Sequence, residues 1–298
     1  MANSVVVGGH FRINCNPDGS WIPVGQGSSG IVSQAQNMQS GAIVAVKIIP
    51  APHFTPEDCA SVLRQLHELY ASSHPHVVEF YGTEYFADKN SVLILTEFMD
   101  LGSLKDVTRR IGRGPEPVVG YIAGRLLEAL VYLHRERRLI HRDIKPSNIL
   151  LNSRGEVKIS DFGISTQLAN TLDPANTWVG STTYMSPERI SGLQYVWNSD
   201  IWSLGITLLE FITGFFPYAG DRQLEMVELL DRIVDEPSPT LPSDQFSAEC
   251  VDFMSLAVKK RVEERPNAEI LLGHPFAVQN SQTDISPWIA QAMASMQQ

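Results

Sequence analysis

With 298 residues, 43% of them hydrophobic and 19% charged, the chain is expected to be globular and long enough for one large domain or two lobes. Its formal net charge of -10 disfavours nonspecific binding to nucleic acid or to an acidic membrane, because phosphate groups repel such a surface.

The first third of the chain is predicted to be a β-rich lobe. Short runs of β-branched residues predict strands at 21–24, 30–34, 43–49, 77–81 and 92–98. One helix interrupts them, with Thr55 as N-cap and Pro56 in its first turn. Its apolar positions Val62, Leu66 and Leu69 share one helical face, which we expect to pack on the sheet.

Beyond residue 101 the apolar periodicity is mostly helical. It predicts helices at 120–134, 199–213, 223–234 and 248–259. A small β-rich lobe followed by a larger helical lobe is an α+β fold. We expect an extension at 1–20, the β-rich lobe at 21–99, the helical lobe at 100–276 and a C-terminal helix within 277–298.

Two features of the β-rich lobe point to phosphate binding. The segment GQGSSG, with Gly25, Gly27 and Gly30, is a GxGxxG loop that continues as a strand, which favours a hairpin over phosphates rather than a dinucleotide-binding turn. Lys47 follows within an apolar strand, where its ammonium is costly unless it meets an anion. A lysine whose charged end reaches water is the alternative for Lys47 taken alone.

The helical lobe carries IHRDIKPSNIL at 140–150 and ISDFG at 159–163. Asp143 can take or orient the proton of an attacking hydroxyl, and Lys145 can balance the charge of a moving phosphoryl group. Asn148 and Asp161 offer the hard oxygen ligands that Mg²⁺ prefers. Together these groups predict phosphoryl transfer from a nucleotide.

In their order and spacing these motifs resemble the eukaryotic protein kinases, from Trp21 to about Phe276. The resemblance implies a bilobal kinase fold and the use of ATP and Mg²⁺. It places Glu188 of SPER opposite Arg265. It assigns a catalytic role to Asp143, Lys145, Asn148 and Lys47 and metal binding to Asn148 and Asp161. The ATP site it implies contains Val24, Gly25, Gly27, Gly30, Val32, Ala45, Lys47, Thr96, Glu97, Met99, Ser103 and Leu150.

One position departs from the family pattern. The helix glutamate that pairs with the strand lysine in this family falls on Gln65, while Glu68 projects toward solvent. A neutral amide can still hydrogen-bond Lys47, but it loses the charge-assisted part, on the order of 1 kcal/mol. We therefore expect the active arrangement of this helix to need other support, and a pseudokinase is one alternative.

Further motifs resemble the dual-specificity MAP kinase kinases: KPSNILLN, SDFGISTQL, YMSPERI and FPY. The resemblance implies a MAP kinase as substrate and a MAP kinase kinase kinase upstream. Residues 283–298 resemble the docking segment that upstream kinases bind. The alternative is an ordinary amphipathic helix that packs on the helical lobe. Residues 1–20 contain only Arg12 as a cation, unlike the basic docking tail of these enzymes, so either the chain is a shortened form or a scaffold or folded surface brings the substrate.

The stretch TLDPANT lies where this family has its activation loop. The resemblance places Thr171 and Thr177 at the phosphorylated positions, with Arg142 as the cation that receives a phosphate. Turn-forming threonines around Asp173-Pro174 are the alternative.

The remaining features concern location. Cys15, Cys59 and Cys250 lack metal-ligand spacing and fit reduced thiols in a cytoplasmic protein. The longest apolar run, 201–216, is too short and polar for a bilayer, so we expect a buried helix and no membrane partner. The sequence thus predicts a cytoplasmic MAP kinase kinase; another STE-type Ser/Thr kinase and a pseudokinase scaffold are the alternatives.

Overall fold

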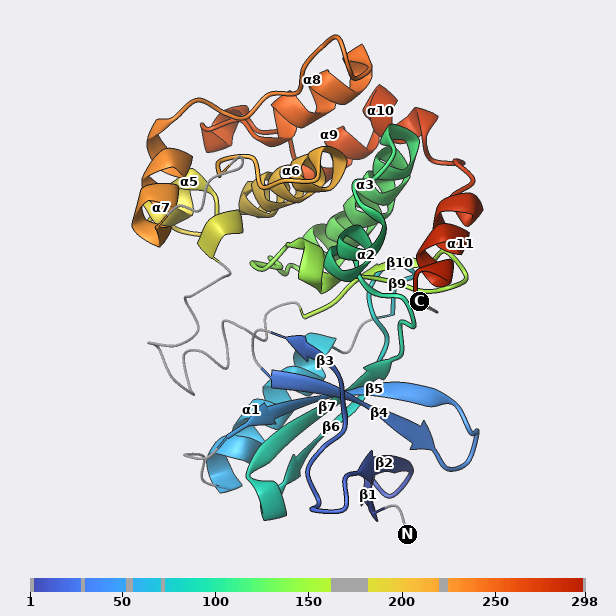
Figure 1. Ribbon diagram of the computed structural model, residues 1–298. Helices are drawn as coiled ribbons and strands as arrows, with labels where there is room; N and C mark the ends of the chain where they lie inside the picture. Colours follow the sequence, from blue (N-terminus) through green and yellow to red (C-terminus); the bar gives the residue numbers. More distant parts are fainter. Residues whose placement is uncertain are drawn as a thin grey trace. The chain divides into compact units, whose positions relative to one another are not determined.

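The computed structural model describes residues 3–27, 30–51, 56–70, 73–161, 182–219 and 225–296. The chain divides into two compact units (Figure 1). One contains the described residues of Met1–His74 and Val78–Met99. The other contains those of Pro75–Val77, Asp100–Gly163 and Val179–Gln298.

The first unit is a β-sheet with one helix. Its strands are β1 (Asn3–Val7), β2 (Phe11–Cys15), β3 (Pro23–Gly27), β4 (Gly30–Asn37), β5 (Ile43–Pro50), β6 (Phe80–Phe86) and β7 (Ser91–Glu97). They run antiparallel in the order β1-β2-β4-β5-β7-β6, and β3 also pairs with β4. Helix α1 (Pro56–Tyr70) contacts β6, with His67 edge-on to Phe80 at 5.3 Å.

The two faces of this sheet differ because side chains alternate along each strand. One face forms a core that includes Val46, Ile48, Leu93 and Leu95. The opposite face carries the residues between them, including Lys47 and Thr96. The alternation along the strands therefore separates the face that forms this core from the face that carries Lys47 and Thr96.

Residues 1–20 do more than extend the chain. Strand β2 pairs with β4, and Val7 and Ile13 are fully buried in the same core. The turn between the strands uses Gly8 and Gly9, both with positive φ. The N-terminal hairpin is thus part of the packing of the first unit.

The second unit is built around two long, mostly buried helices, α3 (Glu116–Val131) and α6 (Trp197–Thr213), which contact each other. Helix α3 begins earlier than predicted because Pro117 in its first turn has no hydrogen bond to lose. It continues as a π-helical turn, Tyr132–Glu136. The other helices are α2 (Leu104–Ile111), α5 (Pro187–Ile190), α7 (Met226–Asp235), α8 (Ala248–Ala257), α9 (Ala268–Leu272), α10 (Pro275–Gln279) and α11 (Ser286–Ala294).

A small sheet and the C-terminal helix complete the second unit. Strands β8 (Gly102–Ser103), β9 (Ile149–Leu151) and β10 (Val157–Ile159) form an antiparallel sheet. Helix α11 packs beside it and against α2 (Figure 1), with Trp288 edge-on to Phe211 at 5.8 Å. Its apolar side chains Ile285, Trp288, Ile289 and Ala292 are buried, so this face closes the unit.

The apolar run predicted as a buried helix is the core of α6, where Ile201, Leu204 and Phe211 are buried. No helix among the described residues has both the length and the apolar character needed to cross a membrane. Strand β6 starts later than predicted, and Val77 instead bridges Ile159 in the second unit.

Candidate active site

The segment 141–148 of the second unit holds a compact group of buried polar side chains. The Nζ of Lys145 lies 2.9 Å from Oδ2 of Asp143, and the amide of Asn148 donates to the same oxygen at 2.9 Å. Burial, the largest single influence, raises the pKa of the Asp143 carboxyl, but the neighbouring groups, first among them Lys145, together outweigh it and keep this pKa below its usual value. Asp143 is therefore an ionised hydrogen-bond acceptor at neutral pH.

Asp200, in the first turn of α6, anchors the backbone of this segment. Its Oδ1 accepts the N–H of Arg142 at 2.9 Å, and its Oδ2 accepts the N–H of His141 at 2.8 Å. The Nε2 of His134 lies 2.8 Å from Oδ2 as well. A buried carboxylate with several donors is well satisfied, and here it fixes the loop that carries Asp143.

His141 is fully buried between the loop and the end of β10. Its Nε2 lies 3.0 Å from the carbonyl oxygen of Ser160, and its Nδ1 accepts the N–H of Asp143. Burial lowers the pKa of the imidazole, so the ring is neutral and Nε2 carries the proton. The ring thus links the position of Asp143 to the residue before Asp161.

The side chains of this loop fit a magnesium ion bound with nucleotide phosphates. The amide nitrogen of Asn148 donates both its bonds to Asp143, which leaves its oxygen to face another partner. Ser160 donates its N–H to the backbone carbonyl of Asn148 at 2.9 Å, which brings the residue before Asp161 to Asn148. One amide and one carboxylate suit Mg²⁺, which keeps waters and phosphate oxygens as further ligands. Among the described residues no three His, Cys, Asp or Glu side chains cluster as a metal site.

The first unit presents the predicted ATP-binding residues of its strands on one face. Val32 lies opposite Lys47 across β4 and β5, and Ala45 lies opposite Thr96 across β5 and β7. All four are on the face away from the hydrophobic core. Lys47 is only 8% exposed, so most of its side chain is shielded from solvent.

The glycine-rich segment is placed on the β3–β4 hairpin. Gly25 and Gly27 lie on β3 with Val24, and Gly30 starts β4. A Cβ at Gly30 would overlap the carbonyl oxygen of Ile48, so close approach of two backbones requires glycine here.

The remaining predicted ATP-binding residues are divided between the units. Glu97 ends β7, and its backbone N–H bonds the carbonyl of Glu79. Met99 is buried, and Leu150 lies on β9. Ser103 has a structural task that was not predicted: it is the N-cap of α2 and forms a capping box with Asp106.

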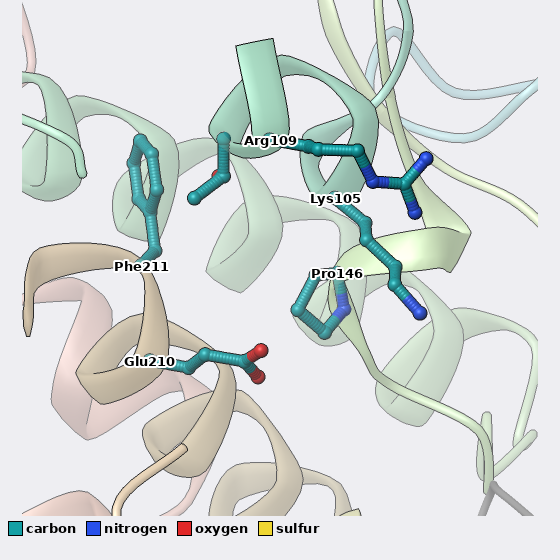
Figure 2. Close-up of a pocket in the computed structure, with 6 residues that line it drawn as sticks. Lys105, Arg109, Pro146, Glu210 and Phe211 are labelled. Atoms are coloured by element: carbon teal, nitrogen blue, oxygen red, sulfur yellow. The ribbon is translucent and has the colours of Figure 1, made fainter. Parts of the chain in front are cut away.

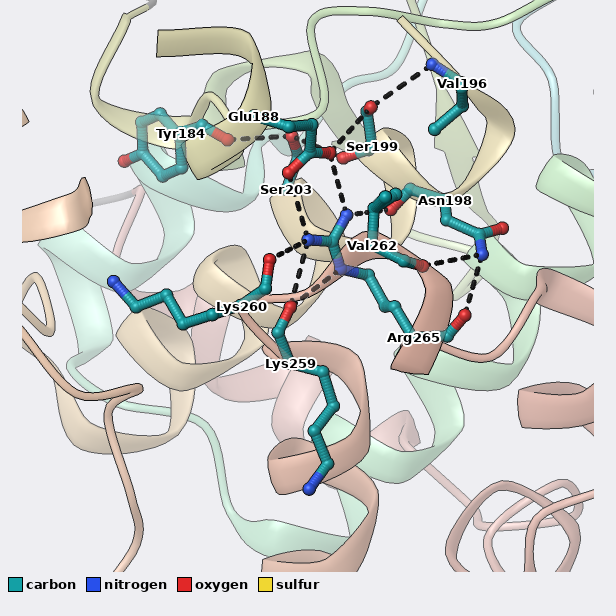
Figure 3. Close-up of polar contacts among 10 residues, drawn as sticks. All are labelled: Tyr184, Glu188, Val196, Asn198, Ser199, Ser203, Lys259, Lys260, Val262 and Arg265. Carbon is teal, nitrogen blue, oxygen red and sulfur yellow. Dashed lines mark hydrogen bonds and ion pairs between the residues drawn. The ribbon is translucent and has the colours of Figure 1, made fainter. Parts of the chain in front are cut away.

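A buried ion pair joins two distant parts of the second unit (Figure 3). The guanidinium of Arg265 binds both carboxylate oxygens of Glu188, at 3.0 and 3.2 Å. It also donates to the carbonyls of Asn198 and Lys259, and Ser199 donates to Glu188 at 2.9 Å. The pairing expected from the sequence is confirmed, with each charge fully hydrogen-bonded.

Comparison with known proteins agrees with this geometry. The family model described as "Protein kinase domain" matches residues 22–277. The chain is 42% identical over 257 residues to mitogen-activated protein kinase kinase 2 of Arabidopsis thaliana, covering 85% of this chain and 70% of that protein. It is 38% identical over 295 residues to the dual specificity mitogen-activated protein kinase kinase dSOR1 of Drosophila melanogaster, covering 91% and 73%.

The chain belongs to the mitogen-activated protein kinase kinase family. A third relative, mitogen-activated protein kinase kinase 1 of Arabidopsis thaliana, is 42% identical over 275 residues, covering 90% of this chain and 77% of that protein. The chain is therefore a protein kinase, an enzyme that transfers phosphoryl groups, with the α+β fold predicted from its motifs.

Gln65 of this kinase is exposed on α1 and forms no side-chain hydrogen bond with the described residues. Leu66, predicted on the packing face, is 1% exposed. The side chains of Val62, Glu68 and Leu69 lie outside the described residues. The structure therefore shows no bond between Gln65 and Lys47.

The kinase has a pocket beside its catalytic loop, of about 150 Å³ (Figure 2). Lys105 extends beside Pro146, which directly follows Lys145, and Phe211 lines the far wall. Burial raises the pKa of Glu210 in this pocket, although a hydrogen bond from Tyr184 opposes the shift.

Of the predicted phosphorylation sites and the arginine expected to receive a phosphate, the structure describes only the arginine. Thr171 and Thr177 lie outside the described residues. Arg142 is described: its side chain is exposed and its backbone has φ of +71°, a left-handed value.

Sequence reasoning missed the residues that hold the loop in place. Asp200 opens the segment DIWSLG, which resembles a kinase motif, but no role was predicted for Asp200 or for His134, 66 positions earlier. The signal available was an aspartate at the start of an otherwise apolar helix, where a carboxylate is retained only if it has partners.

Proposed function

We propose that this kinase transfers phosphate from ATP to the Thr and Tyr of a MAP kinase activation loop. The observation that carries the proposal is the Asp143 carboxylate, held ionised by Lys145 and oriented by Asn148 in a buried loop. Such an acceptor can orient a substrate hydroxyl and take its proton. Phosphoryl transfer depends mainly on positioning and electrostatics, which this loop supplies.

The other residues have complementary tasks in the proposal. Lys145 supplies positive charge beside the hydroxyl and the incoming phosphoryl group. The ammonium of Lys47 would hold nucleotide phosphates, while Val24, Val32, Ala45, Met99 and Leu150 would contact the adenine. Asn148 and Asp161 would hold Mg²⁺. When bound, Mg²⁺ neutralises charge on the phosphate oxygens.

Dual specificity is proposed from the relatives. One of them is named a dual specificity mitogen-activated protein kinase kinase and is 38% identical to this chain. We propose the same class of substrate here, with a MAP kinase kinase kinase acting upstream on Thr171 and Thr177. A phosphate adds about -1.5 to -2 charge at pH 7, which the exposed Arg142 can receive.

The surface of residues 283–298 that an upstream kinase can contact is smaller than the whole apolar face. The apolar face of residues 283–298 that resembled a docking segment is largely buried against α2 and the β8–β10 sheet. The side chains left exposed there include Met293 at 42% and Met296 at 52%. We propose that an upstream kinase that binds this segment contacts these methionines. The buried thiols of Cys15 and Cys250 fit the proposed cytoplasmic location.

A pseudokinase scaffold is a second candidate, favoured by one observation: Gln65 is neutral and exposed where this family has a glutamate. A kinase-dead MAP kinase incubated with the activated chain and ATP separates the candidates. Phosphate on both loop residues supports the proposal. Phosphate on Thr alone, or only on generic proteins, contradicts dual specificity, and no transfer after activation supports the scaffold.

A further inference from the structure

Helix α2 and the turn after it concentrate positive charge in a chain whose net charge is -10. Residues 104–113 contain one acidic side chain, Asp106, and four cationic ones, Lys105, Arg109, Arg110 and Arg113. Lys105 and Arg109 are four residues apart and therefore share one face of the helix. Both line the pocket beside Pro146 (Figure 2), so the pocket has a cationic side next to the catalytic loop.

Helix α2 gives these side chains a fixed base. The capping box of Ser103 and Asp106 closes its first turn, and Leu104 and Val107 are fully buried. The helix also contacts the turn Pro146–Asn148 of the catalytic loop. Because the backbone is held in this way, the length of the Lys105 side chain limits how far its ammonium can move from the loop.

The ammonium of Lys105 is available to a further partner. Among the residues that the structure describes, it forms no ion pair and no hydrogen bond. Arg109 has only an exposed contact with Asp106 at 3.7 Å, which binds weakly. The acid in the pocket is Glu210, whose Oε2 accepts the hydroxyl of Tyr184. Burial raises the pKa of this carboxyl, although Tyr184 and Lys105 oppose the shift.

The pocket lies close to the place where a substrate hydroxyl would meet Asp143. Pro146 is three residues after Asp143, and three residues of chain span at most about 11 Å. A substrate whose hydroxyl lies at Asp143 therefore brings side chains about three positions from that hydroxyl within reach of the pocket. The apolar groups of Pro146 and Phe211 can contact the methylene stem of such a side chain.

We propose that Lys105, together with Arg109, binds an acidic side chain of the protein substrate, within about three residues of the phosphorylated Thr or Tyr. The two cations supply charge-assisted hydrogen bonds to a carboxylate, which are stronger beside the apolar wall of the pocket than in open water. Lys105 and Arg109 are then specificity-determining residues, which select the hydroxyl that reaches Asp143. The inference rests on the proposed function, because it assigns a substrate feature to the same kinase.

The test uses the full-length kinase, activated by an upstream kinase, and a kinase-dead MAP kinase as substrate. Glu, Gln or Lys is placed in turn at each of the three positions before and after the target Thr, except where the target Tyr stands. Wild type is compared with Lys105→Gln, Lys105→Glu and a control, Arg261→Glu, which makes the same change in net charge at an exposed site of the same unit. The readout is the ratio of kcat/KM between the Glu and Gln substrates, which a purely structural role of Lys105 would not alter.

We expect wild type to prefer Glu over Gln about tenfold at one or more positions, which is the effect of a single charge-assisted hydrogen bond. Lys105→Gln should lose most of this preference. Lys105→Glu should prefer Lys over Gln at the same position, and Arg261→Glu should keep the wild-type preference. The Tm of both Lys105 variants should stay close to that of wild type, because this side chain is exposed.

The outcomes separate this inference from the proposed function. If activated wild type transfers phosphate to none of the MAP kinase substrates, the proposed function is wrong and the inference falls with it. If wild type phosphorylates all of them with the same kcat/KM, or if both Lys105 variants keep its preference, only the inference is wrong. A wild-type preference for Lys over Gln would also overturn it, and would assign the pocket to Glu210 and a basic side chain.

Discussion

The guanidinium of Arg265 binds both carboxylate oxygens of Glu188, although the two residues are 77 positions apart and almost completely buried. Glu188 opens α5, and Arg265 follows the turn at Val262–Glu264 (Figure 3). The bond therefore ties the segment after residue 182 to the helices at the end of the second unit.

Loss of one partner in this pair should destabilise the kinase strongly. Arg265→Met leaves a buried carboxylate without its cation, at a cost of about 3–5 kcal/mol in the free energy of unfolding. Urea unfolding measures this loss. Glu188→Leu combined with Arg265→Met should recover part of it, because neither charge remains buried alone. Arg261→Met, which breaks the exposed pair with Glu263, should change stability little. Equal small effects at Arg265 and Arg261 would contradict a structural role for the buried pair.

The pH dependence of catalysis should depend on Lys145. An ionised Asp143 is required, so activity falls as the pH drops through the pKa of this carboxyl. Because Lys145 lowers that pKa, Lys145→Gln should move the acid limb of kcat/KM to higher pH as well as reducing turnover. Lys158→Gln, on β10, should leave the limb in place. An unmoved limb in Lys145→Gln would mean that this lysine acts on the phosphoryl group alone.

Gln65→Glu should raise the activity of the unphosphorylated kinase. A carboxylate that reaches Lys47 gains a charge-assisted bond, on the order of 1 kcal/mol, which corresponds to about fivefold in activity. Gln279→Glu adds the same charge at an exposed position at the end of α10 and is the control. Unchanged or lower turnover of a folded Gln65→Glu protein would show that another residue holds the place of the helix glutamate.

Substitutions of buried and of exposed residues in the C-terminal segment should affect stability and docking separately. Trp288→Ala should cost about 3–5 kcal/mol in unfolding free energy, because the indole is buried against Phe211. Met293→Ser with Met296→Ser should leave Tm nearly unchanged and weaken capture of the upstream kinase in a pull-down. If this double variant still captured the upstream kinase as well as wild type does, the exposed methionines would not be the docking surface.

Local patterns in the sequence predict secondary structure better than they predict contacts between distant residues. Lys47 was predicted within a strand, and it lies in β5; it shares a face of the sheet with Thr96 because side chains alternate along an extended chain. The hairpin Val5–Ile13 and the capping box at Ser103 carried recognisable signals, a Gly-Gly turn and an S-x-x-D pattern, yet were not predicted as strands or a helix start.

Contacts across the chain could not be predicted from the sequence in the same way. The role of Asp200 depends on His134 and His141, which meet it only after α3 and α6 have packed. Helical projection placed Gln65 at the edge of the apolar face; among the side chains of α1 that the structure describes, Gln65 is exposed and Leu66 beside it is buried. Burial of such borderline positions depends on neighbouring elements, not on the helix alone.

The central claim is that this chain phosphorylates a MAP kinase through Asp143. The direct measurement is the rate of phosphate transfer to Thr and Tyr of a kinase-dead MAP kinase by the phosphorylated chain and by its Asp143→Asn variant, with nucleotide binding and Tm measured in parallel. We predict transfer to both residues by wild type and a loss of about 10²–10⁴-fold in the variant, with folding and nucleotide binding retained. Equal transfer by wild type and variant, or none by wild type after activation, would contradict the claim.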